Sequence, residues 1–218
     1  MDVEIRDRPA FAHLLVQMEK GDKIIAEAGA MASMSGQLQM TTRFSGGPRG
    51  ALLRRLFASE SIFINEFSAQ ASGHVVLTQP YPGDIVAVDL RGTTIFLQPG
   101  AFLACEPGIT LGLGWAGVRS LIAREGLFRL KASGHGRVWF GAYGAVVPRD
   151  VDGELIVDSG HLVAYEPTIG IQVGLAAGIF SSFFSGEGII TRVRGQGKIY
   201  LQSRSFGGLA AWTNAHLY

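Results

Sequence analysis

Residues 99–107 read PGAFLACEP and residues 159–167 read SGHLVAYEP, and this pair of stretches decides the fold that the sequence predicts. Both place a glycine before an apolar run and close the run with Glu-Pro at the same offset. A third stretch, AGAMA at residues 28–32, repeats the glycine and the small apolar residues without the Glu-Pro. Recurrence of this kind indicates one structural unit that is present three times.

Further markers follow each stretch in the same order. An acidic residue precedes an apolar run at Glu60, Glu125 and Glu187. A glycine then precedes a second apolar run in all three segments. We therefore expect one compact domain built from three diverged copies, at approximately 1–92, 93–152 and 153–218.

Alternation of side chains predicts the type of element. Leu14, Val16 and Met18 occupy every second position of one run, and Ile199 and Leu201 do so in another. This period of two is typical of strands with one buried face. The glycine pairs at 134/136 and 195/197 stand between apolar runs, where a hairpin or a bulge needs backbone without a side chain.

Helix is predicted only in short connections. Residues 48–57, 116–123 and 175–184 occupy the same place in each copy, between a strand and the glutamate. The uncharged run at 167–185 contains Pro167, three glycines and three serines, and it only just reaches the length of a membrane span. We expect an all-β fold with a few short helical connections and no transmembrane helix.

Composition excludes several classes of protein. Nineteen basic and eighteen acidic residues give a net charge of +1, which does not supply the positive field of a nucleic-acid binder. Cys105 is the single cysteine, so the chain forms no intrachain disulfide. Residues 1–7 are mixed in charge and unlike a signal or transit peptide. We expect a cytoplasmic protein that binds no nucleic acid.

Several short motifs resemble a known family. They are YPGDI at 81–85, GAFLA at 100–104, EGLF at 125–128, DSGHLVA at 158–164 and GEG at 186–188. Together they resemble the altered-inheritance-of-mitochondria protein 24 family over essentially the whole chain. The resemblance implies repeated β-sandwich units similar to the trp RNA-binding attenuation protein. It implies little about activity, since bacterial members have no established biochemical role and only the mitochondrial relatives are associated with inner-membrane organisation.

Candidate catalytic and metal-binding residues favour a structural interpretation. The histidines include no pair three to five residues apart and no adjacent cysteine, which is not the spacing of metal ligands; they are His13, His74, His135, His161 and His216. The recurring glutamates are expected to accept backbone N–H bonds at turns. Cys105 lies in an apolar run, where a small buried side chain is usual. We expect no catalytic residue, cofactor or metal, although a site assembled between copies stays an alternative.

One basic cluster and one aromatic cluster are the candidate contact residues. Arg43, Arg49, Arg54 and Arg55 form a candidate anion contact, with a solvated connection as the simpler interpretation. The aromatic cluster is a candidate interface, since Phe180, Phe183 and Phe184 would share one face of a helix; its members are Trp115, Phe180, Phe183 and Phe184.

These features favour a non-enzymatic β-sandwich assembly or scaffold protein. Its expected partner is a second copy in a homo-oligomer, with a peripheral membrane surface or another protein as the other choices. Two alternatives remain. One is a protein that binds a small apolar ligand between sheets or subunits. The other is an enzyme or metal protein whose site forms between the repeats.

Overall fold

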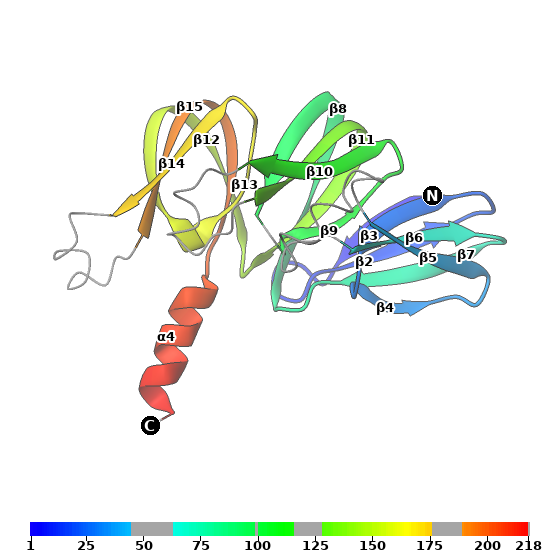
Figure 1. Cartoon of the computed structure of the whole chain (residues 1–218). Coiled ribbons are helices and arrows are strands. Elements are labelled where there is room, and N and C mark those ends of the chain that lie inside the picture. The colour runs from blue at the N-terminus through cyan, green and yellow to red at the C-terminus, as the bar shows by residue number, and fades with distance from the viewer. Residues whose placement is uncertain (45–62, 99, 116–127, 176–188, 218) are drawn as a thin grey trace.

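A computed structural model describes residues 1–44, 63–98, 100–115, 128–175 and 189–217 of the chain. Strands dominate these residues, so the predicted all-β fold is confirmed (Figure 1). The first half contains β1 (Asp2–Arg6), β2 (His13–Met18), β3 (Lys23–Glu27), β4 (Met31–Met34), β5 (Leu38–Phe44), β6 (Phe63–Ala69), β7 (Gly73–Thr78) and β8 (Gly83–Leu97). The second half contains β9 (Phe102–Cys105), β10 (Ile109–Trp115), β11 (Phe128–Tyr143), β12 (Val146–Asp158), η1 (Ser159–His161), β13 (Leu162–Tyr165), β14 (Ile169–Leu175), β15 (Ile189–Gln202) and α4 (Phe206–His216).

The strands form two antiparallel sheets. The smaller sheet has the order β1-β2-β7-β4. The larger sheet follows the path β12-β15-β13-β8-β11-β9-β3-β6-β5, with β10 added beside β11 and β14 beside β15. The long strands β8 and β11 bend at mid-length, and the chain as a whole runs from the β1–β7 end to the β12–β15 end of Figure 1.

One pairing pattern occurs three times. The short strands β4, β9 and β13 each pair with a longer neighbour, and each ladder skips one residue near its start. The ladders are Met31, Ser33 and Met34 against Leu77, Val76 and Val75; Phe102, Ala104 and Cys105 against Phe140, Trp139 and Val138; and Leu162, Ala164 and Tyr165 against Leu201, Tyr200 and Ile199. These equal registers support the three-copy prediction. The proposed copy boundaries, after residues 92 and 152, fall inside β8 and β12 and stay a prediction.

The predicted alternation of buried side chains is confirmed where it was clearest. In β2, Leu14, Val16 and Met18 are buried, and the residues between them are half-buried or exposed. The same period buries one face of β3 and β6. Because neighbouring strands present matching faces, these side chains form a continuous apolar core.

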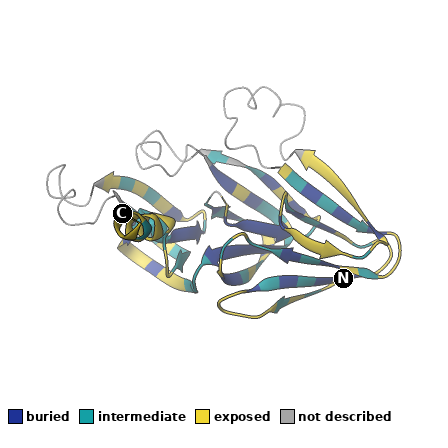
Figure 2. Ribbon diagram, turned by 90° about the horizontal axis from the view of Figure 1, so that it is seen from below, coloured by how far each residue is buried: buried dark blue, intermediate teal, exposed yellow. Residues whose placement is uncertain are grey.

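The described core residues form three packed clusters, which follow one another along the molecule. Phe67 lies fully buried in the first, Phe140 in the second and Ile199 in the third. Figure 2 shows the buried residues gathered in the central strands, whereas α4 is drawn almost wholly as exposed. Strands of the large sheet contribute to all three clusters, since the first cluster includes Leu103 and Trp139 and the second includes Val163.

The prediction of hairpins at the glycine pairs is wrong. Both pairs lie inside the continuous strands β11 and β15. A Cβ atom at Gly134 would stand 2.4 Å from the carbonyl oxygen of Gly108, and one at Gly195 would stand 2.4 Å from that of Thr168. The glycines therefore allow close approach between strands, and the register shift at Gly134 confirms the alternative prediction of a bulge there.

The C-terminal helix α4 was not anticipated from the sequence. The Ser205 hydroxyl accepts a hydrogen bond from the Gly208 N–H at 3.1 Å and caps its first turn. The predicted helical connections 48–57 and 116–123 lie outside the described residues, as does 175–184 except for Leu175, which ends β14. In the described part of the chain, no helix has the length and apolar character needed to cross a membrane.

Candidate functional site

The structure leaves most of the predicted contact residues undescribed. Trp115 ends β10, where its backbone pairs with Phe128, but the position of its side chain is outside the description. Phe180, Phe183 and Phe184 lie outside the described residues altogether. The aromatic interface therefore stays a prediction.

Arg43 is the described member of the predicted basic cluster, since Arg49, Arg54 and Arg55 lie outside the described residues. Its guanidinium approaches the Glu66 carboxylate at 3.3 Å. The same carboxylate receives the Lys23 ammonium at 3.1 Å. Because Arg43 already has an acidic partner, this end of β5 is a mixed ion cluster rather than a patch of positive charge.

The histidines are dispersed over the fold. His74 lies beside the Ser35 hydroxyl at 3.0 Å, and His161 contacts the Gln202 carbonyl at 2.7 Å. His13 approaches the Asp7 carboxylate at 3.2 Å. Within the described ranges, no group of three or more His, Cys, Asp or Glu side chains is placed to hold a metal ion.

The Cys105 thiol is fully buried, as expected from its apolar surroundings. Burial, with a smaller effect of the Glu106 charge, raises its pKa to about 12. A thiol with such a pKa stays protonated near neutral pH, and the thiolate is the reactive form. Cys105 therefore serves as a small packing residue.

The glutamates of the two Glu-Pro pairs fasten the ends of β9 and β13, a role that the sequence did not reveal. The Glu106 carboxylate accepts a hydrogen bond from the Arg137 N–H at 3.0 Å, and the Glu166 carboxylate accepts one from the Lys198 N–H at 2.8 Å. The two Glu-Pro pairs stand at the same distance after Gly100 and Gly160, and this spacing could have indicated that their glutamates share a structural role. The predicted roles of Glu60, Glu125 and Glu187 lie outside the described residues.

A half-buried carboxyl lies near the middle of the molecule. Glu27 ends β3, and burial raises its pKa to about 7. Burial, followed by the Glu27 charge, raises the pKa of Tyr81 to about 12. The Tyr81 hydroxyl donates a hydrogen bond to the Gly100 carbonyl at 2.9 Å, so this phenol is held in a structural contact.

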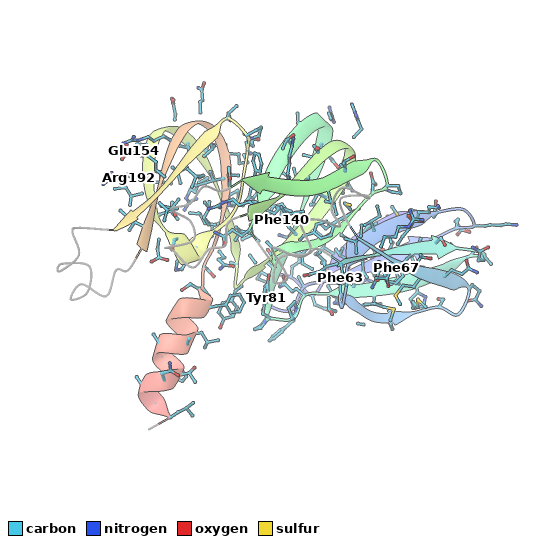
Figure 3. The ribbon with its side chains drawn as sticks, in the orientation of Figure 1. Phe63, Phe67, Tyr81, Phe140, Glu154 and Arg192 are labelled. Atoms are coloured by element: carbon cyan, nitrogen blue, oxygen red, sulfur yellow. The ribbon has the colours of Figure 1, made fainter. Side chains whose placement is uncertain are left out.

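The helix α4 is anchored through two aromatic contacts of Phe206. Phe206 stacks on Tyr143 at 5.0 Å between ring centroids and meets the edge of Tyr81, also at 5.0 Å. Beyond this anchor the helix projects away from the sheets, and Trp212 is 62% exposed (Figure 1). The side chains near Tyr81 can be followed in Figure 3.

The first open edge of the sheets is β4. Every residue of this strand is exposed, including Met31 and Met34, whereas every residue of β9 and of β13 is buried. Among the described strands, β4 pairs with β7 alone and ends its sheet. Its outer backbone groups are therefore available to a further strand.

The second open edge is β12, at the other end of the molecule (Figure 1). In the described part of the chain β12 pairs with β15 alone. Ile156 is 53% exposed, and Leu155 beside it is 37% exposed. A shallow groove of about 340 Å³ runs along this segment; its walls are Val147, Arg149, Leu155, Ile156, Val157, His161, Leu201 and Gln202.

The two edges share features that permit strand addition. An open strand edge with exposed apolar side chains offers backbone hydrogen bonds and apolar area to a partner. We call the exposed edge of β4 the β4 edge, and the segment of β12 around Ile156 the β12 edge.

Comparison with known proteins places this architecture in a family. Residues 3–204 match the family described as mitochondrial biogenesis AIM24. An uncharacterized protein of Streptococcus pyogenes serotype M6 is 26% identical over 211 residues, which cover 93% of this chain and 85% of that protein. A crystal structure of a Streptococcus pyogenes protein has a TM-score of 0.81 and 26% identity, and the match covers 99% of both chains. The chain therefore belongs to the mitochondrial biogenesis AIM24 family.

Proposed function

We propose that this protein is a non-enzymatic scaffold that acts by assembling with further copies of itself. The observation that carries the proposal is that two edge strands of its sheets, at the β4 edge and the β12 edge, have exposed apolar side chains and no outer neighbour among the described strands. Soluble proteins usually protect such edges with charge, proline or a covering element. Burial against a second copy provides the same protection.

The chemistry of the described side chains supports a role without catalysis. The thiol of Cys105 has its pKa raised by burial, and the Tyr81 phenol is engaged with a backbone carbonyl. The histidines make separate contacts with backbone, hydroxyl or carboxylate groups. A nucleophile beside a base, which covalent catalysis requires, is not formed by these groups.

The cytoplasm is the compartment that we propose for this assembly. The single cysteine is a buried free thiol, so the fold does not rely on a disulfide for stability. The partner in this proposal is a second copy, rather than a membrane surface.

The test is the mass of the protein in solution, measured by sedimentation velocity over a hundredfold range of concentration. We expect wild-type protein to sediment as an oligomer. Ile156→Lys should dissociate it, because a buried lysine at the β12 edge would be an uncompensated charge. A matched change, Leu209→Lys on α4, replaces another exposed apolar residue and should leave the oligomer intact.

The results separate the possibilities. Wild-type protein that is monomeric at every concentration would refute the proposal. Dissociation by Leu209→Lys alone would move the association surface to α4. Circular dichroism of each variant confirms that the substitution has not unfolded the chain.

A small apolar ligand is the second candidate. Besides the groove along β12, a cleft of about 280 Å³ lies between β8 and the β13–β14 turn, with Leu90, Ile95, Pro167 and Tyr200 among its lining residues. Pockets of about 300 Å³ accept small molecules. Native mass spectrometry of freshly purified protein would detect a retained ligand as added mass and would also report any bound metal.

A further inference from the structure

The same strand junction occurs twice inside the chain. Where the first part meets the second, β9 pairs with β3, with Ala104 opposite Ala26 and Cys105 opposite Ile25. Where the second part meets the third, β13 pairs with β8. There Ala164 is opposite Leu97 and Tyr165 is opposite Phe96.

Both junctions have the same register. The covering strands β9 and β13 are in equivalent positions, because each makes the same interrupted ladder with its long neighbour. The covered residues are also equivalent, since Ile25 stands four residues before Gly29, and Phe96 stands four residues before Gly100. Both internal junctions therefore join equivalent strands in the same register.

Each of the two strands that form this junction also occurs once without its partner, in two separate parts of the molecule. The strand equivalent to β9 and β13 in the first part is β4, which makes the third interrupted ladder. The residue equivalent to Ile25 and Phe96 in the third part is Ile156, four residues before Gly160. Among the described strands, the β4 edge is therefore a covering strand without a strand to cover, and the β12 edge is a covered strand without its covering strand.

Exposure follows from this missing neighbour. Ile95 of β8 is 1% exposed, whereas its equivalent Leu155 in β12 is 37% exposed. Likewise Cys105 of β9 is fully buried, whereas its equivalent Met34 in β4 is 36% exposed. The residues at the two ends are apolar, as they are at the covered junctions, except that the small residue Ser33 of β4 stands where β9 and β13 have Ala104 and Ala164.

From these registers we infer that chains join head to tail, with β4 of one chain added antiparallel to β12 of the next. Ser33 of one chain then lies opposite Val157 of the next, and Met34 lies opposite Ile156. This inference rests on the proposed function, and it specifies the partner and the register of the assembly.

The internal junction predicts the contacts of the new one. The Gln98 N–H donates to the Val163 carbonyl at 2.8 Å, so the Asp158 N–H should donate to the Ala32 carbonyl of the adjoining chain. Phe96 stacks on Tyr165 at 5.2 Å between ring centroids. The equivalent pair is Ile156 with Met34, two apolar side chains that pack together beside the groove along β12.

Each chain carries one edge of each kind, so the contact is heterologous. Such a contact leaves a free edge at both ends of every growing assembly until a ring closes or a filament extends. A symmetric dimer would instead pair β12 with β12 or β4 with β4. Disulfide crosslinking between β4 and β12 separates these arrangements.

The test is disulfide formation between two single-cysteine substitutions, Ser33→Cys in one preparation and Val157→Cys in another. Residues 33 and 157 would form a non-hydrogen-bonded pair. At the internal junction of β13 with β8, their equivalents Ala164 and Leu97 stand next to Val163 and Gln98, which share the backbone hydrogen bond. Cys105 is buried and should not compete. After mixing and mild oxidation, a disulfide-linked dimer is expected on a non-reducing gel, with each preparation alone remaining uncrosslinked.

The register control replaces Leu155, two residues from Val157 on the same face of β12. Residue 155 lies about 7 Å along the strand from residue 157, which places it too far from residue 33 for a disulfide. We expect Ser33→Cys to crosslink at least tenfold more slowly to Leu155→Cys than to Val157→Cys. Equal rates would overturn the inference, and so would rapid crosslinking of Ser33→Cys chains to one another.

A second pair of variants avoids any change in the core. Met34→Lys and Ile156→Glu alter exposed side chains, and each alone should dissociate the oligomer. Mixing them should restore a heterodimer, since the unchanged Met34 of the Ile156→Glu chain can pair with the unchanged Ile156 of the Met34→Lys chain, and any further contact places lysine opposite glutamate. If wild-type protein is oligomeric but neither rescue nor crosslinking occurs, this arrangement fails and the scaffold proposal stands. If wild-type protein is monomeric throughout, both fail.

Discussion

Replacing Glu27 by glutamine should remove a pH dependence of stability. This carboxyl ends β3 at the first internal junction, and burial raises its pKa from 4.5 to about 7. At the second junction the equivalent position, two residues before Gly100, is held by the neutral amide of Gln98. The substitution Glu27→Gln therefore gives the first junction the side chain that the second already has.

The sign follows from comparing the folded and unfolded chains. Below about pH 4.5 Glu27 is protonated in both, and it contributes no pH dependence. Between pH 4.5 and about 7 the unfolded chain loses the proton while the folded chain keeps it, so the free energy of unfolding falls as the pH rises. Above this range Glu27 is ionised in both states, so the free energy of unfolding falls no further.

The size of the effect follows from the shift. A difference of about 2.5 pK units corresponds to about 3.4 kcal/mol. The side chain keeps part of its surface in solvent, and screening reduces the effect. We therefore expect Glu27→Gln to raise the free energy of unfolding by about 2 kcal/mol at pH 8 and by nothing measurable at pH 4.

Urea unfolding at fixed protein concentration, followed from pH 4 to pH 8, measures the difference between the two proteins. Fixed concentration is needed because association shifts the apparent stability. Glu4→Gln, which alters an exposed ion pair with Arg6, is the control and should change the free energy by less than about 0.5 kcal/mol at any pH. Wild type and Glu27→Gln curves that stay parallel across this range would refute the reasoning.

Two further predictions concern the ends of the strands. Glu166→Ala should lower the free energy of unfolding by about 1–3 kcal/mol in urea, because the Lys198 N–H of β15 loses its acceptor beside the end of β13; an unchanged midpoint would mean that water replaces the carboxylate. Phe206→Ala should release α4, since its ring contacts with Tyr143 and Tyr81 anchor the helix. Amide hydrogen exchange should then become fast in α4 alone, and protection that persists would show another anchor.

The strand content could be predicted because it depends on local pattern. Alternation in β2 and the recurring glycine segments both act through neighbours in sequence, and both indicated strands correctly. The close contacts of Gly134 and Gly195 could not be predicted from the sequence, because they are made with the carbonyl groups of Gly108 and Thr168, which are distant in the chain. Helix α4 was missed since Gly207 and Gly208 weaken helix propensity in its first turn.

The candidate site was harder to predict for a physical reason. The residues MASM of β4 and FLAC of β9 have similar composition, yet one strand is exposed and the other buried. The difference lies in whether another part of the chain covers the outer edge, which no single segment encodes. The aromatic residues of the connections predicted an interface there instead, and Phe180, Phe183 and Phe184 lie outside the described residues.

The distribution of charge along β12 supports the view that its edge is used. Charged residues, which discourage pairing at an edge, occupy positions 149, 150, 152 and 154 before the exposed apolar pair, and the next charged residue is Asp158 at the end of the strand. Glu154, the last charged residue before this pair, is held by Arg192 at 2.7 Å, which Figure 3 shows beside it. Arg194 contacts its other oxygen at 2.5 Å. The uncharged stretch that remains is Leu155, Ile156 and Val157, and it includes both residues that the internal junctions place opposite a covering strand. A protein selected to remain monomeric would be expected to carry a lysine or proline in this stretch or in β4, and neither has one.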